Sequence, residues 1–151
     1  MFALLSFGRH MVLGLGPELF LAIYSSAGVF ASVLSRLTAL AGRRELLDIG
    51  SLGASHCVLA IFALSSCFYP QSRVQIVFLP FFSFSADSAL KAMIAVETIA
   101  LIASLRGIRV LPFDHAAHLG GLLFGLGFYH VGSHLWIRRN RFIRSITGEK
   151  R

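Results

Sequence analysis

The chain has 151 residues, of which 56% are hydrophobic and 14% are charged, and its mean hydropathy is +0.74. Soluble domains carry about a quarter charged residues, so this composition excludes an ordinary soluble domain and favours a helical membrane bundle. The formal net charge of +7 comes partly from a basic cluster near the C-terminus, but there is no soluble basic face that could bind nucleic acid. We therefore expect the lipid bilayer, and no nucleic acid, as a partner.

Five apolar segments predict an all-α, polytopic transmembrane helix bundle. They cover residues 1–15, 19–40, 51–68, 87–105 and 115–137. The bundle would form one transmembrane domain over 1–137, and 138–151 would form a basic C-terminal tail that binds lipid headgroups.

A further apolar stretch, 74–85, contains Pro80 and is too short to cross a bilayer. We expect it to form a re-entrant or interfacial piece. Glu97 lies near the middle of the fourth segment, where a charge is costly unless it faces the bundle interior. Two hypotheses stay open for this residue: a buried glutamate that ties helices together by hydrogen bonds, or a group with a catalytic or proton-relay role.

Ser55 and His118 each lie about four residues inside a different apolar segment. Consecutive membrane helices alternate in direction, so the loops that precede these two segments share one side of the membrane. At 1.5 Å per residue both side chains would lie about 6 Å deep. A neutral imidazole can take the proton of a serine hydroxyl and so activate it for attack. The pair therefore predicts Ser55 as a nucleophile and His118 as its base.

Small residues beside the histidine predict close helix packing. Gly121 and Gly125 form a GxxxG pattern, which lets helix backbones approach each other in lipid. His118 precedes them at helical spacing and shares their face. The base and the packing surface should therefore point the same way.

Other chemistries have less support. The chain has no HExxH sequence, and we predict no metal site and no cofactor. Asp48, Asp87 and Asp114 all lie in loops or at helix ends, which argues against an aspartyl intramembrane protease. A small transporter or channel subunit is a third hypothesis. It rests on Glu97 and the apolar-segment histidines, but no inverted repeat supports it.

Two motifs carry a family resemblance: GAS at 53–55 and AHLGGLLFG at 117–125. With them the chain resembles the rhomboid family of intramembrane serine proteases, and within it the mitochondrial presenilin-associated rhomboid-like group. The resemblance covers roughly residues 1–140. It implies a rhomboid core with about five of its helices present and a Ser55–His118 dyad that needs no cofactor. It also implies cleavage of transmembrane segments of other proteins in the mitochondrial inner membrane.

Two departures from the family pattern bear on activity. The family has an HxxxN motif on an earlier helix, and residues 1–7 resemble the part of that helix just past the asparagine, so we expect an N-terminally truncated chain. Gly53 and the residue after the serine border the oxyanion site. At the position after the serine the family usually has glycine, whereas this chain has His56. We expect the imidazole to crowd the substrate carbonyl, and the alternative is that it donates a hydrogen bond there. These departures favour the alternative function, a catalytically impaired pseudoprotease that binds membrane helices.

Overall fold

The structure, a computed structural model, describes residues 2–42, 54–76, 79–108, 113–132 and 134. Five α-helices and one two-stranded sheet are found in these residues. They are α1 (Phe2–Leu15), α2 (Pro17–Ala41), α3 (Ser55–Phe68), β1 (Arg73–Ile76), β2 (Leu79–Ser85), α4 (Ala86–Leu105), α5 (His115–Gly127) and a π-helical turn (Phe128–Gly132). The predicted helical membrane bundle is confirmed. The predicted basic tail lies outside the described residues.

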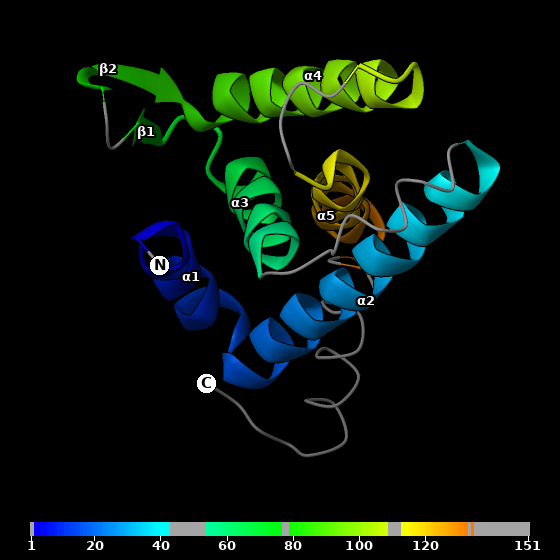
Figure 1. Cartoon of the computed structure of the whole chain (residues 1–151). Coiled ribbons are helices and arrows are strands. Elements are labelled where there is room, and N and C mark those ends of the chain that lie inside the picture. Colours follow the sequence, from blue (N-terminus) through cyan, green and yellow to red (C-terminus); the bar gives the residue numbers. More distant parts are fainter. Residues whose placement is uncertain (1, 43–53, 77–78, 109–112, 133, 135–151) are drawn as a thin grey trace.

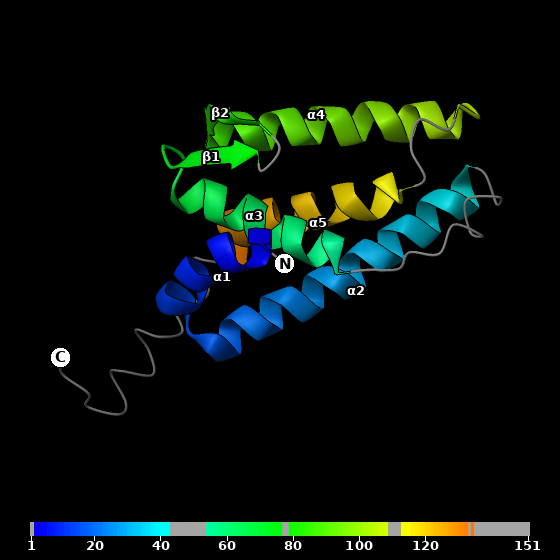
Figure 2. The ribbon, with the colours of Figure 1, turned by 60° about the vertical axis from the view of Figure 1, so that its left-hand side comes forward.

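The helices form three layers (Figures 1 and 2). The outer layer on one side holds α4 and the β1–β2 hairpin, α3 and α5 lie in the middle, and α2 covers the opposite side. Helix α5 contacts α2, α3 and α4, and α3 contacts all four other α-helices. The two middle helices therefore form the core of the bundle, and they carry the candidate nucleophile and base.

Helix α3 is short and almost completely enclosed. Ala60, Ile61, Ala63 and Leu64 have no exposed surface. Its 14 residues span about 21 Å, less than the roughly 30 Å of bilayer hydrocarbon. Because its neighbours surround it, α3 does not have to span the membrane alone. A helix this short leaves at least one of its ends inside the apolar thickness of the bilayer.

Helices α2 and α4 are long and apolar enough to cross a membrane. Many of their large apolar side chains point outward, while small residues such as Ala27, Ala31 and Ala100 are buried against the bundle. The outward set comprises Leu21, Val29, Phe30, Val33, Leu37, Leu40, Val96, Ile99 and Ile102. Large exposed apolar faces with small residues at the helix contacts are the arrangement expected in lipid.

Local sequence explains where α2 begins. Gly16 has a φ of 85°, in the left-handed region that glycine adopts without steric cost. Pro17 follows at the first helical position, where its missing N–H group costs no hydrogen bond. The chain therefore reverses direction at this pair, and α1 and α2 form two separate helices.

The apolar stretch 74–85 contributes to two antiparallel strands, β1 and β2, which the sequence analysis did not predict. The stretch forms part of a hairpin and not of a membrane-spanning helix. Val74 pairs with Phe84 in the ladder, and the Arg73 guanidinium donates to Ser83 Oγ at 3.0 Å. At the end of β2, Ser85 Oγ accepts the Ser88 N–H and caps α4. The hairpin therefore leads directly into the helix that carries the buried glutamate.

Candidate active site

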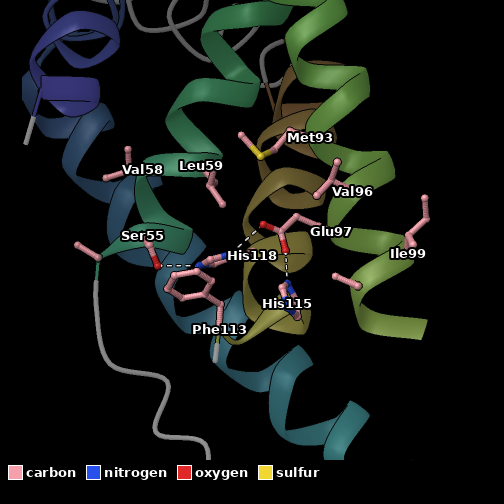
Figure 3. Close-up of a pocket in the computed structure, with 12 residues that line it drawn as sticks. Ser55, Val58, Leu59, Met93, Val96, Glu97, Ile99, Phe113, His115 and His118 are labelled. Atoms are coloured by element: carbon pink, nitrogen blue, oxygen red, sulfur yellow. Dashed lines mark hydrogen bonds and ion pairs between the residues drawn. The ribbon is translucent and has the colours of Figure 1, made fainter. Parts of the chain in front are cut away.

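Ser55 and His118 meet at the same end of the two middle helices. Ser55 is the first residue of α3, so it lies nearer the helix end than the four-residue depth expected. His118 is the fourth residue of α5. Ser55 Oγ lies 3.0 Å from His118 Nε2, at hydrogen-bond distance (Figure 3). The two residues are 63 positions apart in the chain and come together only through the packing of α3 on α5.

Glu97 of α4 lies on the other side of the His118 ring (Figure 3). Its Oε1 accepts a hydrogen bond from His118 Nδ1 at 3.0 Å, and its Oε2 accepts one from His115 Nδ1 at 2.8 Å. The side chains of Glu97 and His115 are 10% and 5% exposed, so the carboxylate is shielded from solvent. These bonds link α4 to α5, in agreement with the first of the two hypotheses for this glutamate.

Asp114 anchors the first turn of α5, which carries both histidines. Its Oδ1 accepts the Ala117 N–H at 2.9 Å, which makes it the N-cap, and its Oδ2 accepts the Ser35 hydroxyl of α2 at 2.6 Å. One carboxylate therefore both starts α5 and ties that turn to α2. His118 is carried by this same first turn of α5.

We expect Asp114→Ala to lower the stability of the bundle. Loss of an N-cap costs about 0.5–2 kcal/mol, and the Ser35 hydroxyl also loses its acceptor. Asp114→Asn keeps an acceptor for the helix and should lose less. Unfolding midpoints of the two variants in mixed micelles measure the difference. Equal midpoints for Asp114→Ala and the unaltered chain would contradict the anchoring role.

Glycines let the backbones of α3 and α5 touch. A Cβ atom added to Gly121 would collide with the carbonyl oxygen of His56. One added to Gly125 would collide with the carbonyl oxygen of Ala60 and lie 2.9 Å from the Ala63 side chain. Both predicted packing glycines therefore lie against α3. This close approach brings the first turn of α5 to the N-terminus of α3.

The side chain of His56, which we expected to crowd the substrate carbonyl, lies toward α2. His56 is buried and its Nε2 lies 3.8 Å from the position of a Cβ atom built on Gly28, so the ring faces α2. It does not line the cavity into which Ser55 opens. The predicted neighbour Gly53 lies outside the described residues.

An apolar cavity of about 730 Å³ opens beside Ser55, between α3, α4 and α5. Its polar lining consists of Ser55, Glu97, His115 and His118, and the rest is apolar (Figure 3). A second cavity of about 490 Å³ continues along α3 and α4 toward α1 and the hairpin. The two cavities share Val58, Leu59, Met93 and Val96. The two cavities therefore lie next to each other along α3 and α4, with Ser55 lining the first, and we call the pair the apolar groove.

Glu97, His115 and His118 also carry ligand atoms within 4.8 Å of one another. A carboxylate and two imidazoles form a donor set that zinc accepts. In the structure, however, both Nδ1 atoms point at the carboxylate and bond to it. Both Nδ1 atoms and both carboxylate oxygens are therefore occupied by hydrogen bonds within the cluster.

The fold and site define a helical membrane protein with a serine–histidine pair that lines an apolar groove. The rhomboid domain model matches residues 1–134, so the chain belongs to the rhomboid family.

Named relatives agree with this assignment. The presenilin-associated rhomboid-like proteins, mitochondrial, of Homo sapiens and Bos taurus are each 40% identical over 145 residues, covering 95% of this chain and 36% of theirs. Rhomboid protein 1, mitochondrial, of Saccharomyces cerevisiae is 29% identical over 131 residues, covering 85% of this chain and 36% of its own. The chain thus spans about a third of the length of these relatives. No solved structure matches it.

Proposed function

We propose that this chain is an intramembrane serine endopeptidase in which Ser55 is the nucleophile and His118 the base. The observation that carries the proposal is the 3.0 Å contact between Ser55 Oγ and His118 Nε2 in the lining of the apolar groove. Membership of the rhomboid family supports the same reaction. The proposed reaction needs only these two side chains, a peptide bond and water.

Peptide hydrolysis at this pair proceeds in two halves. Ser55 Oγ attacks the peptide carbonyl carbon while its proton passes to His118 Nε2. The tetrahedral intermediate collapses, the C–N bond breaks, and the protonated Nε2 gives its proton to the leaving nitrogen. Water then attacks the acyl ester with the same imidazole as base. This attack releases the carboxylic acid and returns the proton to Ser55.

The N-terminus of α3 supports oxyanion stabilisation. The first N–H groups of a helix have no acceptor within that helix, and Ala54 at the N-cap supplies no side-chain acceptor. The N–H groups of Ser55 and His56 are therefore positioned to donate to a carbonyl oxygen that Ser55 attacks. Donors aimed at a developing oxyanion commonly lower a barrier by several kcal/mol, of order 2.7–4 for one donor.

The groove supports membrane-protein segments as the substrate class. Its walls are apolar, and Val96 and Ile99 of α4 are exposed on the lipid-facing surface as well as lining the cavity. A transmembrane segment could therefore reach Ser55 from the bilayer without exposing its own apolar side chains to water. The names of the relatives support a mitochondrial membrane, and the resemblance points to the inner one.

We expect the chain reconstituted in liposomes to cleave a model transmembrane substrate, and Ser55→Ala to abolish that cleavage. The reason is that alanine leaves no nucleophile for His118 to activate. A fluorophosphonate probe, which reacts with an activated serine, should label the unaltered chain only. Ser66→Ala is the matched control, because among the described residues this α3 serine bonds only to the Phe62 carbonyl oxygen.

Two outcomes would reject the proposal. The first is equal cleavage by the unaltered chain and by Ser55→Ala. The second is a folded chain that neither cleaves nor reacts with the probe. In the second case, crosslinking of the chain to the substrate helix would support the pseudoprotease alternative.

We expect His56→Gly not to accelerate cleavage. The imidazole lies against α2 and outside the cavity, so its removal frees no space for a substrate. We also expect this variant to be less stable, because glycine within a helix costs about 1 kcal/mol of folding free energy and a buried side chain is lost. Cleavage rate and unfolding midpoint, measured on the same preparation, test both expectations. A clear gain in rate would restore the crowding hypothesis.

A further inference from the structure

We propose that Glu97 is a positioning residue for His118, so that this chain uses a serine–histidine–glutamate triad instead of a dyad, with His115 holding the glutamate in place. This inference rests on the proposed function and extends it. It is carried by three contacts from three helices: Ser55 to His118, His118 to Glu97, and Glu97 to His115 (Figure 3).

The carboxylate sets the tautomer of the base. A neutral imidazole carries one proton, and a carboxylate oxygen 3.0 Å from Nδ1 of His118 places that proton on Nδ1. Nε2 then keeps its lone pair and accepts the hydroxyl proton of Ser55. The opposite tautomer would present an N–H group to the serine and could not act as its base.

The carboxylate also stabilises the charge that forms on the base. When Nε2 takes the serine proton, the ring becomes an imidazolium next to Glu97, whose side chain is 10% exposed. In such a shielded place a charge pair interacts far more strongly than in water. The attraction between the His118 ring and the Glu97 carboxylate is strongest after the serine proton has moved to Nε2. It therefore lowers the barrier to attack by the serine.

His115 makes this arrangement rigid. Its Nδ1 donates to the second carboxylate oxygen at 2.8 Å, so both oxygens of Glu97 are occupied and the group cannot turn away. His115 Nε2 is buried and has no hydrogen-bond partner in the described part of the chain. A buried N–H without an acceptor is costly, which favours a neutral His115 ring with its proton on Nδ1. The negative charge of Glu97 is then left for His118.

A role limited to tying α4 and α5 together makes different predictions. A structural tie would lower stability when removed, and any loss of activity would follow the loss of folded protein. A positioning role lowers kcat in protein that remains folded, and it leaves substrate binding in the groove unchanged. The experiment therefore needs a conservative pair of variants and separate measurements of kcat, KM and unfolding.

We expect Glu97→Gln to lower kcat by about 10²–10⁴-fold with KM unchanged, the range that a positioned base contributes. The amide can turn its NH₂ group toward His118 and favour the wrong tautomer. Glu97→Asp keeps the charge and should recover at least about tenfold of that loss, because the carboxylate still acts on the imidazolium. His115→Phe, which leaves the carboxylate in place, should lower kcat by roughly three- to tenfold.

Thr98→Val is the matched control. In the part of the chain that the structure describes, its hydroxyl bonds only to the Ile94 carbonyl oxygen of the same helix, so kcat should stay unchanged. Rates of fluorophosphonate labelling at Ser55 should follow kcat across the series, because labelling needs the same base.

The outcomes separate this inference from the proposed function. An unchanged kcat in Glu97→Gln, with Ser55→Ala inactive, would overturn the triad and leave a Ser55–His118 dyad. Equal losses in Glu97→Gln and Glu97→Asp, together with lower unfolding midpoints, would reduce Glu97 to a structural tie. Cleavage that survives in Ser55→Ala, or a folded chain that neither cleaves nor is labelled, would reject the proposed function and the triad with it.

Discussion

Removing Ser55 and His118 together is expected to slow cleavage no further than removing either one alone. Nucleophile and base act as one unit through the 3.0 Å contact, so the first substitution already removes the whole proton-transfer step. Each single variant should lose about 10⁴–10⁶-fold in kcat, and the double variant should lose the same. If the two residues contributed independently, the fold-losses in kcat of the two single variants would multiply in the double variant.

The measurement is a comparison of Ser55→Ala, His118→Ala and the double variant, with His130→Ala as a matched histidine control. His130 lies on the exposed π-helical turn and contacts the Tyr129 ring, far along the helix from the serine. His130→Ala should cleave and label normally. If His118→Ala retained the labelling rate of the unaltered chain, another group would have to serve as the base.

The alternation of membrane helices made the serine–histidine pair predictable. It restricts which helix ends share a side, so Ser55 and His118 could be placed at one end of the bundle without knowledge of their contacts. The depth was less accurate, because Ser55 begins α3 and does not lie a turn inside it. Helix ends depend on local caps, and Ala54 provides no side-chain cap that would mark the start in the sequence.

The rotation of each helix about its own axis was harder to predict. Adjacent residues on a helix point about 100° apart, so Ser55 faces the cavity while His56 faces α2. Proximity in sequence to the serine therefore did not indicate which way the His56 side chain points, and its effect on the substrate stays a prediction.

The histidine partners of Glu97 were not predicted, for the same reason. The sequence shows a glutamate inside one helix and a histidine pair at the start of the next, but not that their faces meet. One signal was present: two histidines at i, i+3 share a face. A carboxylate in the preceding membrane helix must also find donors somewhere in the bundle.

We expect Gly121→Ala to destabilise the bundle and to reduce cleavage. The added methyl group meets the carbonyl oxygen of His56, which belongs to the backbone of α3 and cannot turn aside as a side chain would. Overpacking of this kind costs about 1–3 kcal/mol, more than the roughly 1 kcal/mol that alanine gains over glycine in a helix. To relieve the contact α5 must move away from α3, which lengthens the distance between Ser55 and His118.

Gly127→Ala separates packing from helix propensity. Gly127 ends the same helix, and an added Cβ atom there meets nothing within 4 Å. The unfolding midpoint of Gly127→Ala should stay unchanged or rise, while that of Gly121→Ala falls. Equal shifts in the two variants would mean that the backbones of α3 and α5 are not in contact. A drop in stability at Gly121 without a drop in cleavage would mean that the serine–histidine geometry does not depend on this contact. The combination of lower stability and lower cleavage at Gly121, with neither at Gly127, is what the packing of α5 on α3 requires.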